Sequence, residues 1–388
     1  MNVLHISLKP VYPQVDGGCT AMANFLELLH ETFTTVDHIC IATPKHPFFA
    51  NEYNEYLPSN VNLLAHFHID TTIKKFKFLS SLGRKIPYQV ERFYASEMAN
   101  YLEEIAENYD VVFLESAFLL PYLKHLTKAK KVFVRTHNAE FKIWETKANT
   151  TKNALNKIVF KRLSNQMKRY ELSGLSQTNG LIHISSKDEQ TFQKLLPNIP
   201  QLTVSLALND TNFVAPKADF NVNEWGFLGA MNWQPNQQAI ETLQKTLFPA
   251  LQTKFPQAKL FIAGYGTDEL TATHSNCTIL GSVDNIYDDF HAKISVFLAP
   301  LKSGSGLKIK VVQAIREGNL VVGSAIAFEG LEFLPHKKIV HSTADYISEL
   351  EKIQDNATVV DEIKAQQDAL KQHFGKQVLI SKLTQFVH

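Results

Sequence analysis

Short apolar runs alternate with longer amphipathic stretches along the whole chain. In the first half, buried strands are predicted at residues 3–7, 38–42, 111–114, 131–135 and 181–185. In the second half, they are predicted at residues 225–228, 259–263, 278–280, 296–299 and 320–323. Helical periodicity between and after these strands predicts helices at residues 20–31, 90–107, 153–175, 236–255, 285–290, 309–317 and 358–388. This alternation is typical of parallel sheets flanked by helices.

The two successive sets of strands and helices predict an α/β protein with two Rossmann-like domains. A chain of 388 residues is too long for one ordinary core, since domains usually contain roughly 100–200 residues. The segment 197–224 is rich in proline, asparagine and aspartate and is predicted to join the domains. We expect an N-terminal domain at 1–205, a C-terminal domain at 206–370, and a terminal helix at 371–388 that packs back on the first domain.

Composition narrows the class of protein. With 45% hydrophobic residues, 20% charged residues and a net charge of +1, the chain has no global field that favours nucleic acid. Its three cysteines are far apart and form no CxxC pair, so we expect a reduced compartment without disulfides or a zinc site. The first residues indicate a strand rather than a signal peptide, and no apolar run approaches the ~18 residues of a membrane span. These features predict a cytoplasmic protein.

The segment 297–331 carries the most specific motif. An apolar strand is followed by a loop containing Gly304 and Gly306, a helix that opens on Lys308 and Lys310, and a second strand. Such a βαβ crossover forms an anion site at the helix N-terminus, where backbone N–H groups and the helix dipole face a ligand. Cations disfavour that end of a helix, so the two lysines indicate a bound phosphate or diphosphate.

Three other strand ends in the second half lead into small or polar turns. Gly229 follows the first strand, Gly264 follows the second, and Gly281 opens a turn before another helix. Asn236 is predicted to cap the helix after the first of these turns. Because the carboxyl ends of parallel strands share one edge of a sheet, the four turns together predict a nucleotide pocket in the C-terminal domain.

Two strand ends in the first half are further candidates. Gly17 and Gly18 precede a helix and would allow a ligand close to the backbone, although such a turn is also ordinary loop structure. It lacks the GxGxxG fingerprint and its acidic partner, which disfavours a nicotinamide enzyme. His137 follows another strand, where it could bond a sugar hydroxyl, act as an acid or base, or simply hold a loop.

A basic helical stretch covers residues 142–171. It contains six lysines, two arginines and two glutamates, a balance of 8 − 2 = +6. Apolar residues recur at helical spacing along it: Leu155, Ile158, Val159, Leu163, Met167 and Tyr170. A second basic cluster lies between Lys74 and Lys85. Two interpretations stay open, a face that rests on anionic lipid or an ordinary solvated face.

In several segments the chain resembles the retaining glycosyltransferases of family 4. The segments are GFLGAMNWQPN, FIAGYG, LGSVDNIYDDF and APLKSGSGLKIKVVQAIREGNLVVGSAIAFEGL, together with the early GG turn and RTHNAEF. The resemblance implies the GT-B fold, in which two Rossmann-like domains face a central cleft. It also implies transfer of a sugar from a UDP- or GDP-linked donor, with retention, to a glycan or lipid-linked acceptor. Neither a metal nor a cofactor is expected, because basic side chains and helix dipoles stabilise the leaving diphosphate.

The resemblance assigns roles to individual residues. Lys308 and Lys310 are expected to hold the diphosphate, and His137 is expected to contact the transferred sugar, which the Gly17–Gly18 turn approaches. Val283 would meet the nucleobase, and Glu329 would lie close to the donor. The other donor-site residues on this pattern are Gly229, Gly264, Ser305, Gly306 and Gln313.

One departure from the family weakens these expectations. Its members usually carry two glutamates eight residues apart at this helix, where this chain has Ser305 and Gln313. An amide still bonds ribose hydroxyls but loses a charge-assisted contact of about 1 kcal/mol. A weakened nucleotide-sugar binding or scaffold protein is therefore the alternative to an active enzyme. An epimerase of the same fold is disfavoured, since only His137 and Glu140 lie where acid–base groups would be needed.

The basic surface favours a lipid-linked acceptor, surface polysaccharide synthesis and peripheral contact with the inner face of a membrane.

Overall fold

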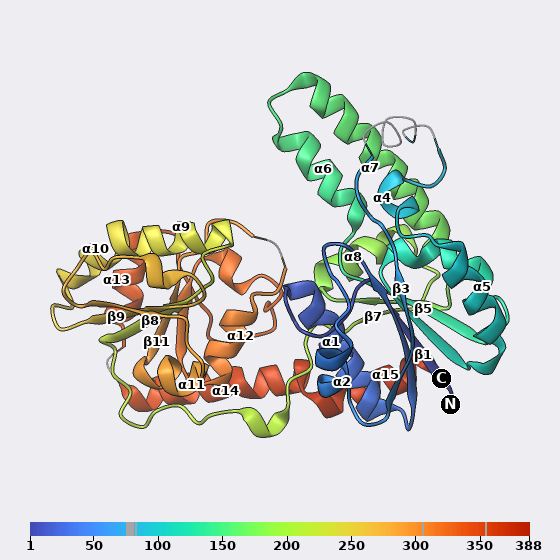
Figure 1. Cartoon of the computed structure of the whole chain (residues 1–388). Coiled ribbons are helices and arrows are strands. Elements are labelled where there is room, and N and C mark those ends of the chain that lie inside the picture. The colour runs from blue at the N-terminus through green and yellow to red at the C-terminus, as the bar shows by residue number, and fades with distance from the viewer. Residues whose placement is uncertain (75–80, 82–83, 305, 354) are drawn as a thin grey trace. The chain divides into compact units, whose positions relative to one another are not determined.

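The structure is a computed structural model that describes residues 1–74, 81, 84–304, 306–353 and 355–388 (Figure 1). The described chain divides into two compact units. The first contains Met1–Ala207 and Lys376–His388, and the second contains Leu208–Gly375. Ser305, and residues 75–80 and 82–83 of the second basic cluster, lie outside the described residues.

The first unit is built on a parallel sheet with the order β3-β2-β1-β4-β5-β6-β7. Its strands are β1 (Val3–Ser7), β2 (Val36–Ala42), β3 (Val61–His68), β4 (Val111–Glu115), β5 (Lys131–Thr136), β6 (Gly180–His183) and β7 (Gln201–Thr203). β1 and β4 are buried at every position, which explains their continuous apolar runs. The two edge strands are not predicted from the apolar pattern, because β3 is exposed at alternate positions and β7 has only three residues.

Successive strand residues in the first unit point to opposite faces of the sheet and build two core clusters. Val111 and Phe113 belong to one cluster, and Val112 and Leu114 belong to the other. The first cluster is covered by α1 and by α15, which contributes Leu379, Leu383 and Val387. The last helix therefore packs within the first unit.

The helices predicted at residues 20–31 and 153–175 agree with the structure except at their ends, whereas the helices at residues 50–56, 117–125, 140–150 and 186–195 are not predicted by the apolar pattern. The helices of the first unit are α1 (Gly17–Thr32), α2 (Ala50–Tyr56), α4 (Tyr88–Glu91), α5 (Ser96–Ile105), η1 (Ala106–Asn108), η2 (Ala117–His125), α6 (Glu140–Thr150), α7 (Ala154–Leu175), α8 (Ser186–Leu195) and α15 (Lys376–Val387). The single helix predicted at residues 90–107 is wrong. The Tyr122 hydroxyl accepts a hydrogen bond from the Ala95 N–H and donates one to the Phe93 carbonyl, both at 2.8 Å. These bonds satisfy the backbone where α4 and α5 separate.

The second unit contains a parallel sheet with the order β10-β9-β8-β11-β12-β13. Its strands are β8 (Glu224–Leu228), β9 (Lys259–Ala263), β10 (Cys277–Gly281), β11 (Val296–Ala299), β12 (Leu320–Gly323) and β13 (Lys338–Ile339). β11 and β12 are buried throughout. β13 is an edge strand of two residues and gives no sequence pattern.

The helices of the second unit surround this sheet. They are η3 (Asp210–Asn212), α9 (Gln234–Thr242), the π-helical η4 (Leu243–Leu247), α10 (Phe248–Gln252), η5 (Thr267–Glu269), α11 (Ile286–Asp289), η6 (His291–Lys293), α12 (Ile309–Arg316), η7 (Ala325–Phe328), α13 (Thr343–Glu351) and α14 (Asn356–Phe374). α9 is capped at Trp233 rather than at Asn236, so the predicted cap is wrong. The helix predicted at 358–388 is two helices, α14 and α15, separated at Gly375.

Two global expectations concern cysteines and membrane spans. Cys19, Cys40 and Cys277 are all buried, and none of them forms a disulfide. Among the described residues, no helix combines the length and apolar character needed to cross a bilayer.

Candidate active site

The order in which strands are added to the second sheet reverses between β8 and β11. The chain proceeds from β8 to β9 and β10 on one side, and from β11 to β12 and β13 on the other. Ligands of open α/β sheets bind at the carboxyl ends of the strands beside such a switch point. Gly229 directly follows β8, and α12 with its lysines follows β11. The glycine loop therefore lies at the position where a ligand is expected.

Lys310 is a largely buried cation at this point. Its Nζ donates a hydrogen bond to Asn236 Oδ1 at 2.5 Å and lies 4.5 Å from the centroid of the Phe227 ring. Burial, helped by the nearby charge of Lys308, lowers the pKa of Lys310 to about 7. No carboxylate among the described residues pairs with it. A bound anion would supply the missing partner.

Lys308 lies two residues before Lys310 in the chain and has a different environment. It is the N-cap residue of α12, and its Nζ donates to the Gly306 carbonyl at 2.5 Å and to Glu329 Oε2 at 3.3 Å. Three of the predicted site residues are thus brought together at the start of one helix. Glu329 balances the charge of Lys308, whereas the charge of Lys310 has no such balance.

The glycines after β8 and β9 are required by close packing. A Cβ at Gly229 would lie 2.9 Å from Lys310 Nζ and 2.8 Å from Asn236 Cγ, and a Cβ at Gly264 would lie 2.5 Å from the Gly229 carbonyl oxygen. Backbone bonds of 2.9 Å link the turns in series, from the Gly229 N–H to Ala263 and from the Gly264 N–H to Gly281. By contrast, a Cβ at Gly306 would meet nothing within 4 Å, which leaves open space beside the helix start.

The remaining predicted donor residues have fewer contacts. Val283 is half-buried in the turn after β10. Gln313 is half-buried on α12, and its side chain makes no hydrogen bond within the described part of the chain. Ser305 lies outside the described residues. The geometry around Lys310 is therefore better defined than the proposed ribose and base contacts.

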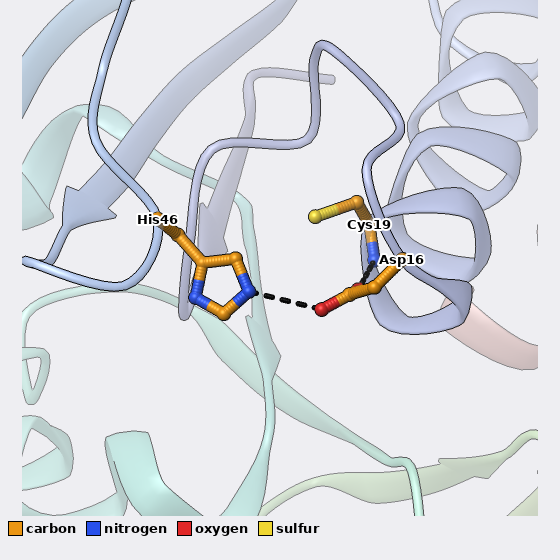
Figure 2. Close-up of side chains that lie close together, drawn as sticks. All are labelled: Asp16, Cys19 and His46. Carbon is orange, nitrogen blue, oxygen red and sulfur yellow. Dashed lines mark hydrogen bonds and ion pairs between the residues drawn. The ribbon is translucent and has the colours of Figure 1, made fainter. Parts of the chain in front are cut away.

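In the first unit, a hydrogen-bonded network shapes the turn before α1 (Figure 2). Asp16 caps α1 by accepting a bond from the Cys19 N–H at 2.8 Å. The same carboxylate accepts bonds from Lys9 Nζ at 2.6 and 2.7 Å and from His46 Nε2 at 2.9 Å. A Cβ at Gly17 would meet nothing within 4 Å. The network thus fixes a turn with open space at Gly17.

The side chains of Asp16, Cys19 and His46 also have the spacing of a metal site, since their ligand atoms lie within 4.8 Å of one another (Figure 2). Burial would raise the pKa of Asp16, but the bonds from Lys9, the Cys19 N–H and His46 lower it well below its usual range. Burial raises the pKa of the Cys19 thiol, which disfavours the thiolate that a metal needs. A cation would have to displace the Lys9 ammonium, so these residues fit a structural network better than a metal centre.

His137 is held by a buried carboxylate, Glu115, at the end of β4. Glu115 Oε2 accepts a hydrogen bond from His137 Nε2 at 2.7 Å, and Oε1 lies 3.1 Å from His5 Nε2. Arg135 Nη1 pairs with both oxygens at 3.1 and 3.2 Å. Burial alone would raise the pKa of Glu115, but Arg135 and the two histidines lower it well below its usual range. Glu115 is thus a carboxylate that can only accept hydrogen bonds.

Because Glu115 only accepts, the hydrogen atom of neutral His137 resides on Nε2, and its Nδ1 is left as an acceptor. The network continues inward, as His5 Nδ1 lies 2.9 Å from His38 Nδ1, and His38 Nε2 lies 2.6 Å from the Tyr53 hydroxyl. This chain of contacts fixes the orientation of His137 at the carboxyl edge of the first sheet. Nδ1 is the ring atom available to accept a bond from a ligand hydroxyl.

Sequence reasoning missed three residues that position the candidate sites, namely Asp16, Glu115 and Asn236. Glu115 could have been suspected, since it and Arg135 are opposite charges at the ends of two buried runs. The sequence predicts Asn236 only as a helix cap, and its bond to Lys310 has no sequence signal.

A large groove lies elsewhere in the first unit. It has a volume of about 1520 Å³ and is lined mainly by η2 and α7. Its lining includes Val132 and Asn179, which lie at the amino ends of β5 and β6, opposite His137. The groove is therefore separate from the candidate active site.

The architecture defined by these sheets is the GT-B fold of nucleotide-sugar glycosyltransferases. Anabaena Alr3699/HepE in complex with UDP has a TM-score of 0.63 at 11% identity, over 99% of each chain. The lipopolysaccharide outer core galactosyltransferase WaaB has a TM-score of 0.62 at 11% identity, over 100% of this chain and 99% of that one. At such low identity the likeness establishes the fold.

The family follows from the sequence of the second unit. Residues 223–356 match the family described as glycosyl transferases group 1, and the chain therefore carries a group 1 glycosyltransferase domain. A Klebsiella pneumoniae protein described as an uncharacterized 44.6 kDa protein in cps region is 23% identical over 347 residues, which cover 85% of this chain and 84% of that protein. The predicted fold is confirmed, and the predicted group 1 glycosyltransferase domain is confirmed for residues 223–356.

Proposed function

We propose that this protein transfers a sugar, with retention, from a UDP- or GDP-linked donor to a glycan or lipid-linked acceptor. The observation that carries the proposal is the largely buried amino group of Lys310 at the switch point, where no described carboxylate pairs with it. The group 1 family match and the UDP held by the structurally similar HepE protein support a nucleotide diphosphate as the anion. The cps region in the name of the Klebsiella relative supports a role in surface polysaccharide synthesis.

In the proposed reaction, the bond between the anomeric carbon and the diphosphate oxygen breaks, and a bond to an acceptor hydroxyl forms. The acceptor proton leaves with the diphosphate. Lys310, Lys308 and the N-terminus of α12 stabilise the negative charge that develops on the leaving group. These groups take the place of a metal ion, so we propose a metal-independent reaction.

The other residues have proposed roles around this centre. Gly306 leaves room for the phosphates, Gly229 and Gly264 let the strand-end turns pack closely beside Lys310 at the donor site, and Val283 meets the base. Gln313 contacts the ribose, Ser305 and Glu329 lie near the donor, and the Gly17–Gly18 turn approaches the transferred sugar. The acceptor atom Nδ1 of His137 receives a hydrogen bond from a sugar hydroxyl. The open space at Gly17 and Gly306 supports the two glycine assignments.

The test is a thermal-shift and turnover screen of the purified protein against UDP- and GDP-sugars. At least one donor should raise the melting temperature, and Lys310→Ala should abolish that shift and the turnover. Lys302→Ala is the matched control, since Lys302 is exposed in the same loop. If no nucleotide sugar binds, the scaffold alternative is favoured. If Lys310→Ala leaves turnover unchanged, the proposed diphosphate role is wrong.

A further inference from the structure

The hairpin formed by α6 and α7 in the first unit is exposed at its joined end, where residues 152–158 are all exposed. The two helices pack along each other and are joined by residues 151–153. Figure 1 shows that the joined end of this hairpin extends away from the sheet of the first unit. We call residues 143–162 the hairpin tip.

Burial divides α7 into two parts. Leu163, Met167 and Leu175 are buried near the sheet, whereas Leu155 and Ile158 in the tip are 74% and 66% exposed. The part of α7 near the sheet is therefore covered, whereas the part in the tip presents apolar side chains at the surface. Leu155 and Ile158 are three residues apart and therefore lie side by side on the helix surface.

The charge around these two side chains is mostly positive. Residues 142–162 contain five lysines and one arginine against a single acid, Glu145, a balance of 6 − 1 = +5. Lys152, Lys157 and Lys161 are exposed and form no ion pair with any described residue. The whole chain has a net charge of only +1, so the positive charge is concentrated here.

We infer that the hairpin tip docks on the surface of an anionic lipid bilayer. Leu155 and Ile158 enter the headgroup region, and Lys152, Lys157 and Lys161 contact lipid phosphates. Exposed apolar side chains flanked by lysines are the features of an interfacial helix, in which burial and electrostatic attraction act together. A nucleic acid would satisfy the lysines but would leave the two apolar side chains without a partner.

The adjacent groove supports a lipid surface as the partner. Ile158, Lys161 and Arg162 also line the groove of about 1520 Å³, whose other walls include Leu120 and Leu123. The combination of apolar and basic side chains thus continues from the tip along α7. This inference goes beyond the proposed reaction, because vesicle binding requires neither a donor nor an acceptor.

The experiment is co-sedimentation of the full-length protein with vesicles of phosphatidylcholine alone or mixed with phosphatidylglycerol. Wild type should bind the anionic vesicles at low salt, and binding should weaken as salt screens the lysines. Leu155→Ser combined with Ile158→Ser should lower the partition coefficient at least about tenfold. Replacing Lys152, Lys157 and Lys161 by glutamine should lower it by a similar factor of about ten. Both sets of residues are exposed, so the fold should be retained.

The matched charge control replaces Lys254, Lys364 and Lys382 by glutamine, since these lysines are exposed elsewhere in the chain. This variant should bind like wild type. Equal binding to neutral and anionic vesicles would overturn the requirement for anionic lipid. Wild-type-like binding by the Leu155/Ile158 variant would overturn the role of the tip. If that variant instead converts a dimer into a monomer and wild type does not bind vesicles, the tip is an interface between copies.

Discussion

Binding of a diphosphate should draw a proton onto Lys310. In the free protein, burial and the charge of Lys308 lower the pKa of Lys310 to about 7. An anionic oxygen about 4 Å away, at an effective dielectric constant of about 20, favours the ammonium form by about 4 kcal/mol. That energy corresponds to about three pKa units. The bound-state pKa of Lys310 should therefore return to about 10.

The sign and size of the effect follow from these two values. Below pH 7 the lysine is already protonated, so binding is tightest and takes up little proton. The expected uptake is about 0.5 proton per site at pH 7 and about 0.9 at pH 8. Above pH 7 the free lysine loses its proton, and the apparent Kd should rise towards about tenfold per pH unit until the bound-state pKa is reached.

The assay is isothermal titration calorimetry with the nucleoside diphosphate that binds in the screen. Measurements between pH 7 and 9, in tricine and in Tris, report proton uptake through the difference in buffer ionisation enthalpy. The ligand's own last phosphate proton, with a pKa near about 6, is already lost in this range. Lys310→Arg is the control, because a guanidinium stays charged and should give a flat pH dependence. A Kd that does not change from pH 7 to 9, with no buffer dependence, would refute the reasoning.

Four further predictions follow from the site geometry. Glu115→Gln should lower the free energy of unfolding by about 3 kcal/mol, because it leaves Arg135 buried without its charge partner. An unchanged urea midpoint would contradict this. Gly229→Ala should weaken diphosphate binding about tenfold, since the new Cβ overlaps Lys310 and forces it to move. Equal Kd values for this variant and wild type would show that the lysine position is not critical. Gln313→Glu should raise donor affinity about fivefold through a charge-assisted bond to the ribose, worth about 1 kcal/mol. A loss of affinity measured by calorimetry would argue against a ribose contact. Turnover should persist in EDTA, and its loss followed by recovery with a divalent cation would contradict the metal-independent reaction.

The sequence by itself determined the central strands and their order of appearance. The predicted bounds of β1, β9, β11 and β12 agree with the structure. These strands lie inside parallel sheets with both faces covered, so their apolar runs are nearly continuous. The glycine loop could also be predicted from the sequence, because the strand, the glycines and the helix start follow one another within a short segment.

Three of the four edge strands could not be predicted in the same way, although the fourth, β10, was predicted at residues 278–280. β3, β7 and β13 lie at the ends of the two sheets, where a strand buries less apolar surface and needs no apolar run. Likewise, the break between α4 and α5 depends on the Tyr122 hydroxyl, which bonds their connecting backbone from a distant segment. Helical periodicity alone carries no information about such a bond.

Only the tertiary structure decided which side chains meet at the candidate site. Asn236 bonds Lys310 across 74 positions, and Glu115 joins His137 to His5, which is 110 positions away from Glu115. The tertiary structure also decided which apolar side chains are exposed. Helical spacing predicts Leu155 and Ile158 as part of the apolar side of a helix, and the structure leaves both exposed at the hairpin tip. The sequence could predict residue types and local elements because these depend on near neighbours. The pairing of charges and the covering of faces depend on contacts between distant segments.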